Sequence, residues 1–147
     1  MQFRALKIAS ILIFCTRNGA SSGDDWLGAA RNEIVSNDAG GYLANYVDRV
    51  QNLRSCRQRV TFAGRCDSSC TLLLSLPSSQ LCITPGAASG FHAPSAPTES
   101  GARAAQAYLM SKYPGWVRNW IASQGGLTST VVTMDYAYPA RFIRTCG

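Results

Sequence analysis

The sequence has little charge, few acidic residues and a single histidine, and each shortage excludes a kind of site. Of its 147 residues 15% are charged, eight are Asp or Glu, and His92 is the only histidine. One histidine cannot complete the usual ligand sets of zinc, and the six cysteines lack the paired CxxC spacing of zinc sites. We therefore expect neither a metal nor another cofactor.

Long basic blocks are also missing, although the formal net charge is +6. The densest basic stretch, residues 54–65, holds four arginines and one aromatic residue, Phe62. It has no glycine-rich RNA motif, and a charge cluster of this kind is usually a solvated face. We expect no nucleic-acid partner.

No hydrophobic run is long enough to span a bilayer, but a short one lies near the N-terminus. Arg4 and Lys7 precede the mostly apolar residues 8–14, and small and polar residues follow over 16–23. This order is typical of a secretory signal peptide. A buried N-terminal strand is the alternative interpretation.

The expected cleavage site is at Ala20 or Gly23. With the later end, the leader spans residues 1–23 and leaves one compact domain over 24–147. Hydrophobic residues make up 46% of the chain, which supports a packed core. We predict a periplasmic or secreted protein.

Cysteine usage agrees with export. Removal of the leader would remove Cys15 and leave five cysteines, enough for two disulfides and one free thiol in an oxidising compartment. Cys66 with Cys82 is the first pairing we expect, and Cys56 with Cys146 is the second.

Signals for strands and helices alternate along the chain. Strands are expected over 33–36, 59–63, 81–84, 88–92 and 128–133, the second of them ended by Gly64. Helices are expected over 24–32, 42–54, 70–76, 99–112 and around 116–121, with a last short helix before Cys146. This alternation favours one α/β domain with a small, mostly parallel sheet flanked by helices.

Three features together indicate acyl-transfer chemistry. Ser68 follows a strand and begins an apolar helix, where backbone N–H groups can hold an oxyanion. His92 follows a later strand, and Gly40-Gly41 follows an earlier one. The carboxyl ends of parallel strands meet at one sheet edge, so we expect a nucleophile, a base and backbone donors to lie there together.

Each feature also has an ordinary structural interpretation. A serine at the start of a helix is most often an N-cap, a lone histidine beside Phe91 is often structural, and a diglycine is often a turn. Thiol chemistry at Cys70 is a further alternative, set against that of a buried and inert cysteine.

The residues 38–94 resemble the core of the Clp-protease proteolytic subunit, within the Clp/crotonase fold. The resemblance rests on the order and spacing of three pieces: Asp38-Ala39-Gly40-Gly41, Gly64 through Leu74, and Gly90-Phe91-His92-Ala93-Pro94. The chain resembles more closely a group of uncharacterised exported bacterial proteins of this superfamily. The matching elements there are Cys66 to Thr71, Cys82 to Pro85, Gly90 to His92, Tyr113-Pro114, Trp120 and Cys146.

The resemblance implies a serine hydrolase or peptidase-like site. By position, Ser68 is the nucleophile and His92 the base, and the N–H groups of Gly41 and Ser69 form the oxyanion hole. Ser69 replaces Ser68 as nucleophile if the helix begins one residue later. The family places an Asp beyond the helix that follows the histidine, and Asp135 is the only Asp C-terminal to His92.

The resemblance also allows a peptide or acyl substrate and an oligomer, but the sequence shows no feature that corresponds to the Clp ring assembly. A second hypothesis therefore stands beside the first: a non-catalytic binding or scaffold protein that keeps the Clp/crotonase fold.

Overall fold

The computed structural model describes residues 32–147, which form a mixed α/β fold around one sheet. The leader predicted over 1–23 lies outside the described residues. The strands of the described chain are β1 (Asn32–Asp38), β2 (Arg59–Asp67), β3 (Leu81–Ile83), β4 (Ala88–Phe91), β5 (Val132–Asp135) and β6 (Arg144–Thr145). The helices are α1 (Leu43–Ser55), α2 (Glu99–Lys112) and α3 (Gly115–Ser123), with short 3₁₀ helices η1 (Ser68–Ser75), η2 (Ser78–Gln80) and η3 (Pro139–Arg141).

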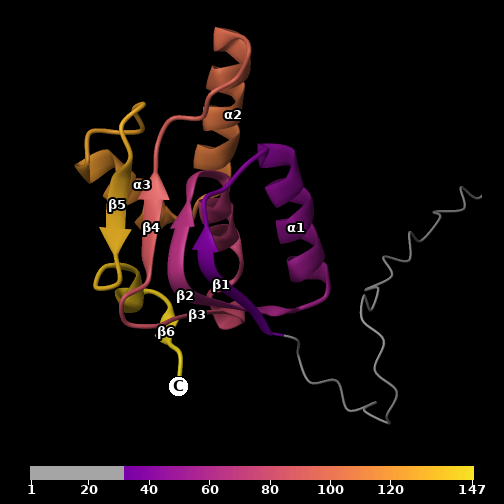
Figure 1. Cartoon of the computed structure of the whole chain (residues 1–147), viewed down its shortest axis with the longest axis vertical. Helices are drawn as coiled ribbons and strands as arrows, with labels where there is room; N and C mark the ends of the chain where they lie inside the picture. Colours follow the sequence, from indigo (N-terminus) through magenta and orange to yellow (C-terminus); the bar gives the residue numbers. More distant parts are fainter. Residues whose placement is uncertain (1–31) are drawn as a thin grey trace, which may run out of the picture.

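The sheet is mostly parallel and divides at β2. β1 pairs with β2 along one side, while on the other side β3 pairs with the first part of β2 and β4 with its last part. β6 continues the sheet beside β3, and β5 runs antiparallel beside β4. Figure 1 shows β5, β4, β2 and β1 from left to right, with α1 beyond β1. The predicted mostly parallel sheet is confirmed within the described residues.

The core lies around η1, which is buried almost along its whole length. Leu72, Leu73 and Leu74 are each at most 2% exposed, and the helix packs against α1 and α2. A helix that is apolar on all sides belongs in the interior, so the prediction of a buried helix here is confirmed. Because η1 directly follows β2, its first residues are held between the sheet and this core.

The strand predicted over 59–63 was expected to end at Gly64, but β2 continues to Asp67. A register shift occurs here, since Val35 pairs with Phe62 but Asn37 pairs with Arg65. The extra residue in β2 forms a bulge, and Gly64 lies against the backbone of Ser36. Glycine at this position therefore allows a close backbone approach and does not terminate the strand.

Both predicted disulfides are wrong. Cys66 is bonded to Cys70, and Cys82 is bonded to Cys146. The first bridge closes the turn from β2 into η1, and the second links the parallel neighbours β3 and β6. Cys56 is also disulfide-bonded, so no cysteine of the described chain is free.

These two disulfides and the bonded Cys56 agree with folding in an oxidising compartment. Within residues 32–147, no helix is both long and apolar enough to cross a membrane.

Candidate functional site

Three segments meet where β1, β2 and β4 end. Asp38 of β1 pairs with Cys66 of β2, and Asp67 of β2 pairs with Gly90 of β4. The diglycine, the serine and the histidine singled out in the sequence follow these three parallel strands directly. The carboxyl ends of parallel strands are where ligand sites of α/β folds form. The structure thus brings these segments to one edge of the sheet.

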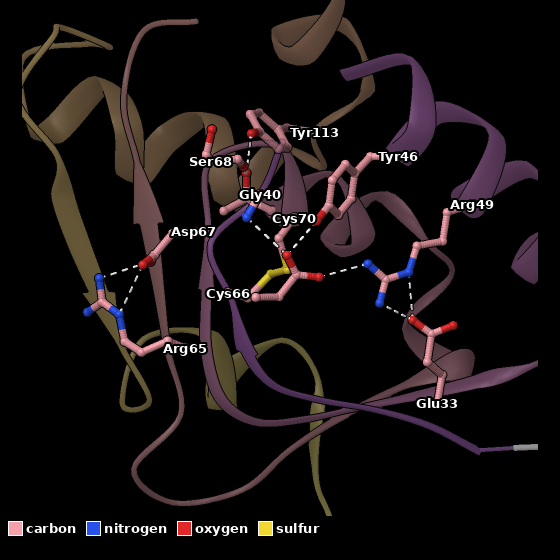
Figure 2. The surroundings of a disulfide bond; sticks show 12 residues. Glu33, Gly40, Tyr46, Arg49, Arg65, Cys66, Asp67, Ser68, Cys70 and Tyr113 are labelled. Carbon is pink, nitrogen blue, oxygen red and sulfur yellow. Dashed lines mark hydrogen bonds and ion pairs between the residues drawn. A yellow bond between two sulfur atoms is a disulfide. The ribbon is translucent and has the colours of Figure 1, made fainter. Parts of the chain in front are cut away.

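Ser68 has a left-handed backbone conformation, with φ of +57°. This conformation costs a non-glycine residue about 1–2 kcal/mol, so surrounding contacts must hold it. Ser68 is the first residue of η1 and lies within the turn that the Cys66–Cys70 disulfide closes (Figure 2). Its side chain is half-buried, which leaves the hydroxyl reachable from solvent.

The diglycine loop packs directly on the Ser68 turn. A methyl group at Gly40 would lie 2.7 Å from both the Asp67 carbonyl oxygen and Ser68 Cβ, and 2.9 Å from the Ser69 nitrogen. Gly40 also has a φ of +81°, which favours glycine. The Ser69 hydroxyl donates a hydrogen bond of 2.6 Å to the Gly41 carbonyl. The loop and the turn therefore form one connected unit.

These contacts separate the roles of the neighbouring hydroxyl and thiol groups. Ser69 is 8% exposed, and its hydroxyl is occupied by the bond to Gly41, so it serves as a structural link. Since η1 begins at Ser68, the condition for Ser69 as the nucleophile is not met. Cys70 is in a disulfide, so the hypothesis of thiol chemistry at this residue is wrong.

The ring of His92 is half-buried, and its Nδ1 lies 2.8 Å from the carbonyl oxygen of Ala93. A carbonyl can only accept, so Nδ1 carries the proton in this hydrogen bond and Nε2 is the basic nitrogen. Within the described chain, no hydrogen bond joins the Ser68 hydroxyl to this ring. Catalytic hydrogen bonds are often long before substrate binds and shorten in the complex.

Asp135 does not lie beside His92. β4 and β5 are antiparallel, and Asp135 pairs with Ala88 at the opposite end of β4 from the histidine. Ala88 precedes His92 by four residues, or about 13 Å along an extended strand. Asp135 is exposed, and its carboxylate accepts a hydrogen bond of 3.1 Å from the Ala137 N–H. The sheet register thus separates the candidate acid from the base, and the Ala93 carbonyl orients the imidazole instead.

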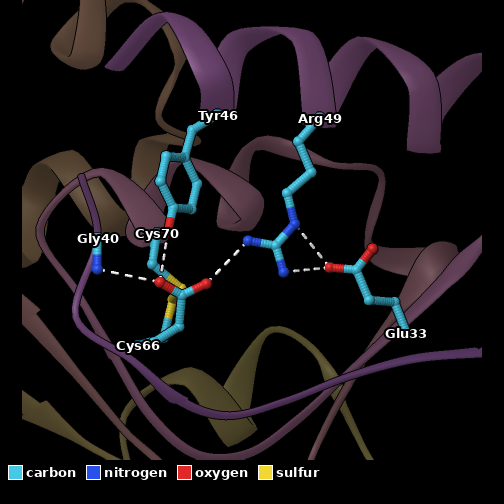
Figure 3. A network of polar contacts seen from close by, with 7 residues as sticks. Glu33, Gly40, Tyr46, Arg49, Cys66 and Cys70 are labelled. Atoms are coloured by element: carbon cyan, nitrogen blue, oxygen red, sulfur yellow. Dashed lines mark hydrogen bonds and ion pairs between the residues drawn. A yellow bond between two sulfur atoms is a disulfide. The ribbon is translucent and has the colours of Figure 1, made fainter. Parts of the chain in front are cut away.

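Behind the diglycine lies a polar network centred on Asp38 (Figure 3). Its carboxylate accepts hydrogen bonds from the Gly40 N–H at 3.0 Å, from the Tyr46 hydroxyl, and from Arg49 at 2.8 Å. Arg49 also pairs with Glu33, which links α1 to β1. The network fixes the start of the diglycine loop relative to both elements.

The network changes the ionisation of its members. Burial acts to raise the pKa of Asp38, but the hydrogen bonds from Tyr46, Arg49 and Gly40 outweigh burial, so this pKa lies below its usual value. Burial and the hydrogen bond to Asp38 raise the pKa of Tyr46 to about 12. Asp38 is therefore ionised, and Tyr46 is protonated, over the whole neutral range.

Asp38→Asn is expected to lower the free energy of unfolding at pH 7 by roughly 1–3 kcal/mol, because charge-assisted hydrogen bonds are lost. The lowered pKa of Asp38 stabilises the fold above the unfolded-state value of about 3.9, and this contribution disappears as the pH falls through the folded-state pKa. Urea unfolding of wild type and variant between pH 7 and pH 2 measures both effects.

The matched control for that change is Asp48→Asn, an exposed carboxylate on the same helix that Arg49 belongs to. We expect its stability to stay within about 0.5 kcal/mol of wild type. If Asp38→Asn loses no more stability than Asp48→Asn, the network does not hold the loop.

Sequence reasoning missed the residues that support the turn from behind. The Thr71 hydroxyl donates to the Ser68 carbonyl at 2.6 Å and lies 2.6 Å from the Tyr113 hydroxyl. A partial signal existed for Tyr46 and Arg49, which are three residues apart on one face of a predicted helix. Nothing in the sequence pattern connects Tyr113 to the turn, because the contact joins residues 42 positions apart.

Comparison with protein-family models and with curated proteins finds no match to this chain. Within residues 32–147, no group of three or more His, Cys, Asp or Glu residues is placed to hold a metal ion. The residues at the ends of β1, β2 and β4 are therefore the basis for inferring a function.

Proposed function

We propose that the protein is an exported serine hydrolase or peptidase-like enzyme in which Ser68 is the nucleophile and His92 the base. The observation that carries this proposal is the left-handed Ser68, held between the diglycine loop and the Cys66–Cys70 disulfide. Strained backbone that surrounding contacts maintain is concentrated at functional sites. The order of diglycine, serine and histidine on adjacent strand ends also supports a Clp/crotonase-like fold.

In the proposed reaction, His92 Nε2 takes the Ser68 hydroxyl proton as the oxygen attacks the acyl carbon of the substrate. The N–H groups of Gly41 and Ser69 stabilise the negative charge on the substrate oxygen. His92 then returns the proton to the leaving group, and water releases the acyl group by the same steps. The Ala93 carbonyl holds the imidazole in the tautomer that these reaction steps need.

A fluorophosphonate probe tests the proposal because it reacts with activated serines. We expect wild-type protein to be labelled, Ser68→Ala to be unlabelled, and His92→Ala to be labelled about a hundredfold more slowly. Asp135→Asn is the control, since that carboxylate lies away from His92, and it should be labelled at the wild-type rate. Labelling that persists in Ser68→Ala would count against the proposal.

One observation favours a second candidate function. Because the described residues contain no Ser68–His92 hydrogen bond, the edge could bind a peptide or acyl group without turning it over. A non-catalytic binding or scaffold protein would leave Ser68 unlabelled while retaining affinity for such ligands. The same labelling experiment therefore separates the two candidates.

A further inference from the structure

Tyr113, at the end of α2, is almost completely buried behind the Ser68 turn, with 2% of its surface exposed. Its hydroxyl lies 2.6 Å from Thr71 Oγ1, which lies 2.6 Å from the Ser68 carbonyl oxygen. The carbonyl can only accept, so Thr71 uses its one proton for Ser68. Tyr113 must then donate to Thr71, and the direction of the whole chain is fixed.

The ring of Tyr113 makes a second contact at the same edge. It packs edge-on against Phe91, with ring centroids 5.7 Å apart and planes at 73°. Phe91 is 1% exposed and directly precedes His92. Edge-to-face pairs of this kind contribute about 0.5–1.5 kcal/mol beyond the area that they bury. Through its hydroxyl, Tyr113 therefore contacts Thr71, which binds the Ser68 carbonyl. Through its ring, it contacts Phe91, which precedes His92.

The hydroxyl is suited to a permanent donor role. Burial raises the pKa of Tyr113 to about 12, so the proton stays on the oxygen throughout the neutral range. A buried chain of hydrogen bonds in which each member has a partner is rigid, whereas one with a missing donor leaves a buried acceptor unsatisfied. The Ser68 carbonyl is thereby held in the orientation that the left-handed backbone requires.

We propose that Tyr113 is a positioning residue that sets Ser68 and His92 relative to each other, through Thr71 on one side and Phe91 on the other. This inference rests on the proposed function, because it concerns the reactivity of the same serine. Tyr113 does not touch substrate and takes no part in proton transfer.

The rate of fluorophosphonate labelling at Ser68 tests the inference. Tyr113→Phe keeps the ring contact and removes the donor, and we expect labelling about tenfold slower, the loss expected for one hydrogen bond. Thr71→Val breaks the same chain and should slow labelling at least as much. Thr71→Ser keeps the hydroxyl and should restore most of the wild-type rate, which a loss of packing alone would not allow.

Tyr138→Phe is the matched control, because the partly buried Tyr138 hydroxyl donates to the Trp116 carbonyl at 3.1 Å, away from the turn. We expect it to lower Tm about as much as Tyr113→Phe while leaving the labelling rate unchanged. A wild-type labelling rate in Tyr113→Phe overturns the inference, as does an equal loss of rate in Tyr138→Phe. The Thr71→Val, Tyr113→Phe double variant should lose no more than Thr71→Val, because both break one chain.

Failure of the proposed function is distinguishable from failure of this inference. If wild-type Ser68 is not labelled at all, the hydrolase proposal fails, and amide NMR spectra decide the positioning role alone. Tyr113→Phe should then shift the amide signal of Ser68, because it removes the donor to Thr71, while Tyr138→Phe leaves that signal in place. An unchanged signal in Tyr113→Phe would overturn the inference.

Discussion

Gly64→Ala is expected to lower the free energy of unfolding by roughly 3–5 kcal/mol, enough to unfold much of the protein. The new methyl group would overlap the Ser36 carbonyl oxygen and lie 2.8 Å from its carbonyl carbon. Both atoms belong to the backbone of β1, so neither can rotate away as a side chain would. Relief requires β1 and β2 to separate at the bulge. Urea unfolding followed by circular dichroism measures the loss.

Gly115→Ala is the control for Gly64→Ala. Gly115 begins α3, and the nearest atom to a methyl group there is Arg118 Nη2 at 3.9 Å. Because alanine favours helix over glycine by up to about 1 kcal/mol, we expect this variant to be neutral or slightly stabilised. If the two alanine variants unfold at the same urea concentration, the bulge does not need glycine.

The role of Gly64 shows which part of the fold the sequence could not predict. Local propensity treats glycine after β-prone residues as a strand end, and the predicted strand accordingly stopped at residue 63. The strand continues because β1 approaches it there, an interaction between segments that propensity does not describe. The strand predicted over 128–133 differs from β5 for a similar reason, since pairing with β4 determines its bounds.

Helices were predicted more accurately, because their signals are local. The helix expected over 42–54 is α1, Leu43–Ser55, and the helix expected over 99–112 has the same bounds as α2. The cap of α2 is also a local contact, because the Thr98 side chain accepts a hydrogen bond from the Gly101 N–H at 3.1 Å. Amphipathic spacing and caps act within one segment, so no tertiary contact is needed to find them.

The candidate site was predictable as far as chain order determines it. Ser68 and His92 follow β2 and β4, which are parallel neighbours in the sheet although β3 lies between them in the chain. Asp135 belongs to an antiparallel strand, whose register decides which end of β4 it faces. Disulfide partners such as Cys66 and Cys70 are likewise decided by geometry that a list of cysteines does not contain. The order of the segments thus predicted that Ser68 and His92 lie at one edge of the sheet, and the strand register placed Asp135 elsewhere.

Gly40→Ala is expected to remove most of the reactivity of Ser68 and to lower the free energy of unfolding by roughly 2–4 kcal/mol. The φ of +81° alone costs alanine about 1–2 kcal/mol. The remainder comes from the methyl group, which would lie 2.7 Å from Ser68 Cβ and from the Asp67 carbonyl oxygen. The diglycine loop must then move away from the turn, carrying the Gly41 N–H with it. We expect fluorophosphonate labelling to slow about a hundredfold, the effect of losing one oxyanion donor.

Gly86→Ala separates backbone strain from steric overlap. Gly86 has a φ of +89°, close to that of Gly40, but no atom lies within 4 Å of a methyl group placed there. This variant should therefore show the conformational cost alone, about 1–2 kcal/mol, with Ser68 labelled at the wild-type rate. Equal labelling of Gly40→Ala and Gly86→Ala would contradict the argument, because the loop would then be free to move without effect on the serine. A slower rate in Gly40→Ala alone ties the reactivity of Ser68 to the contact between the diglycine loop and the turn.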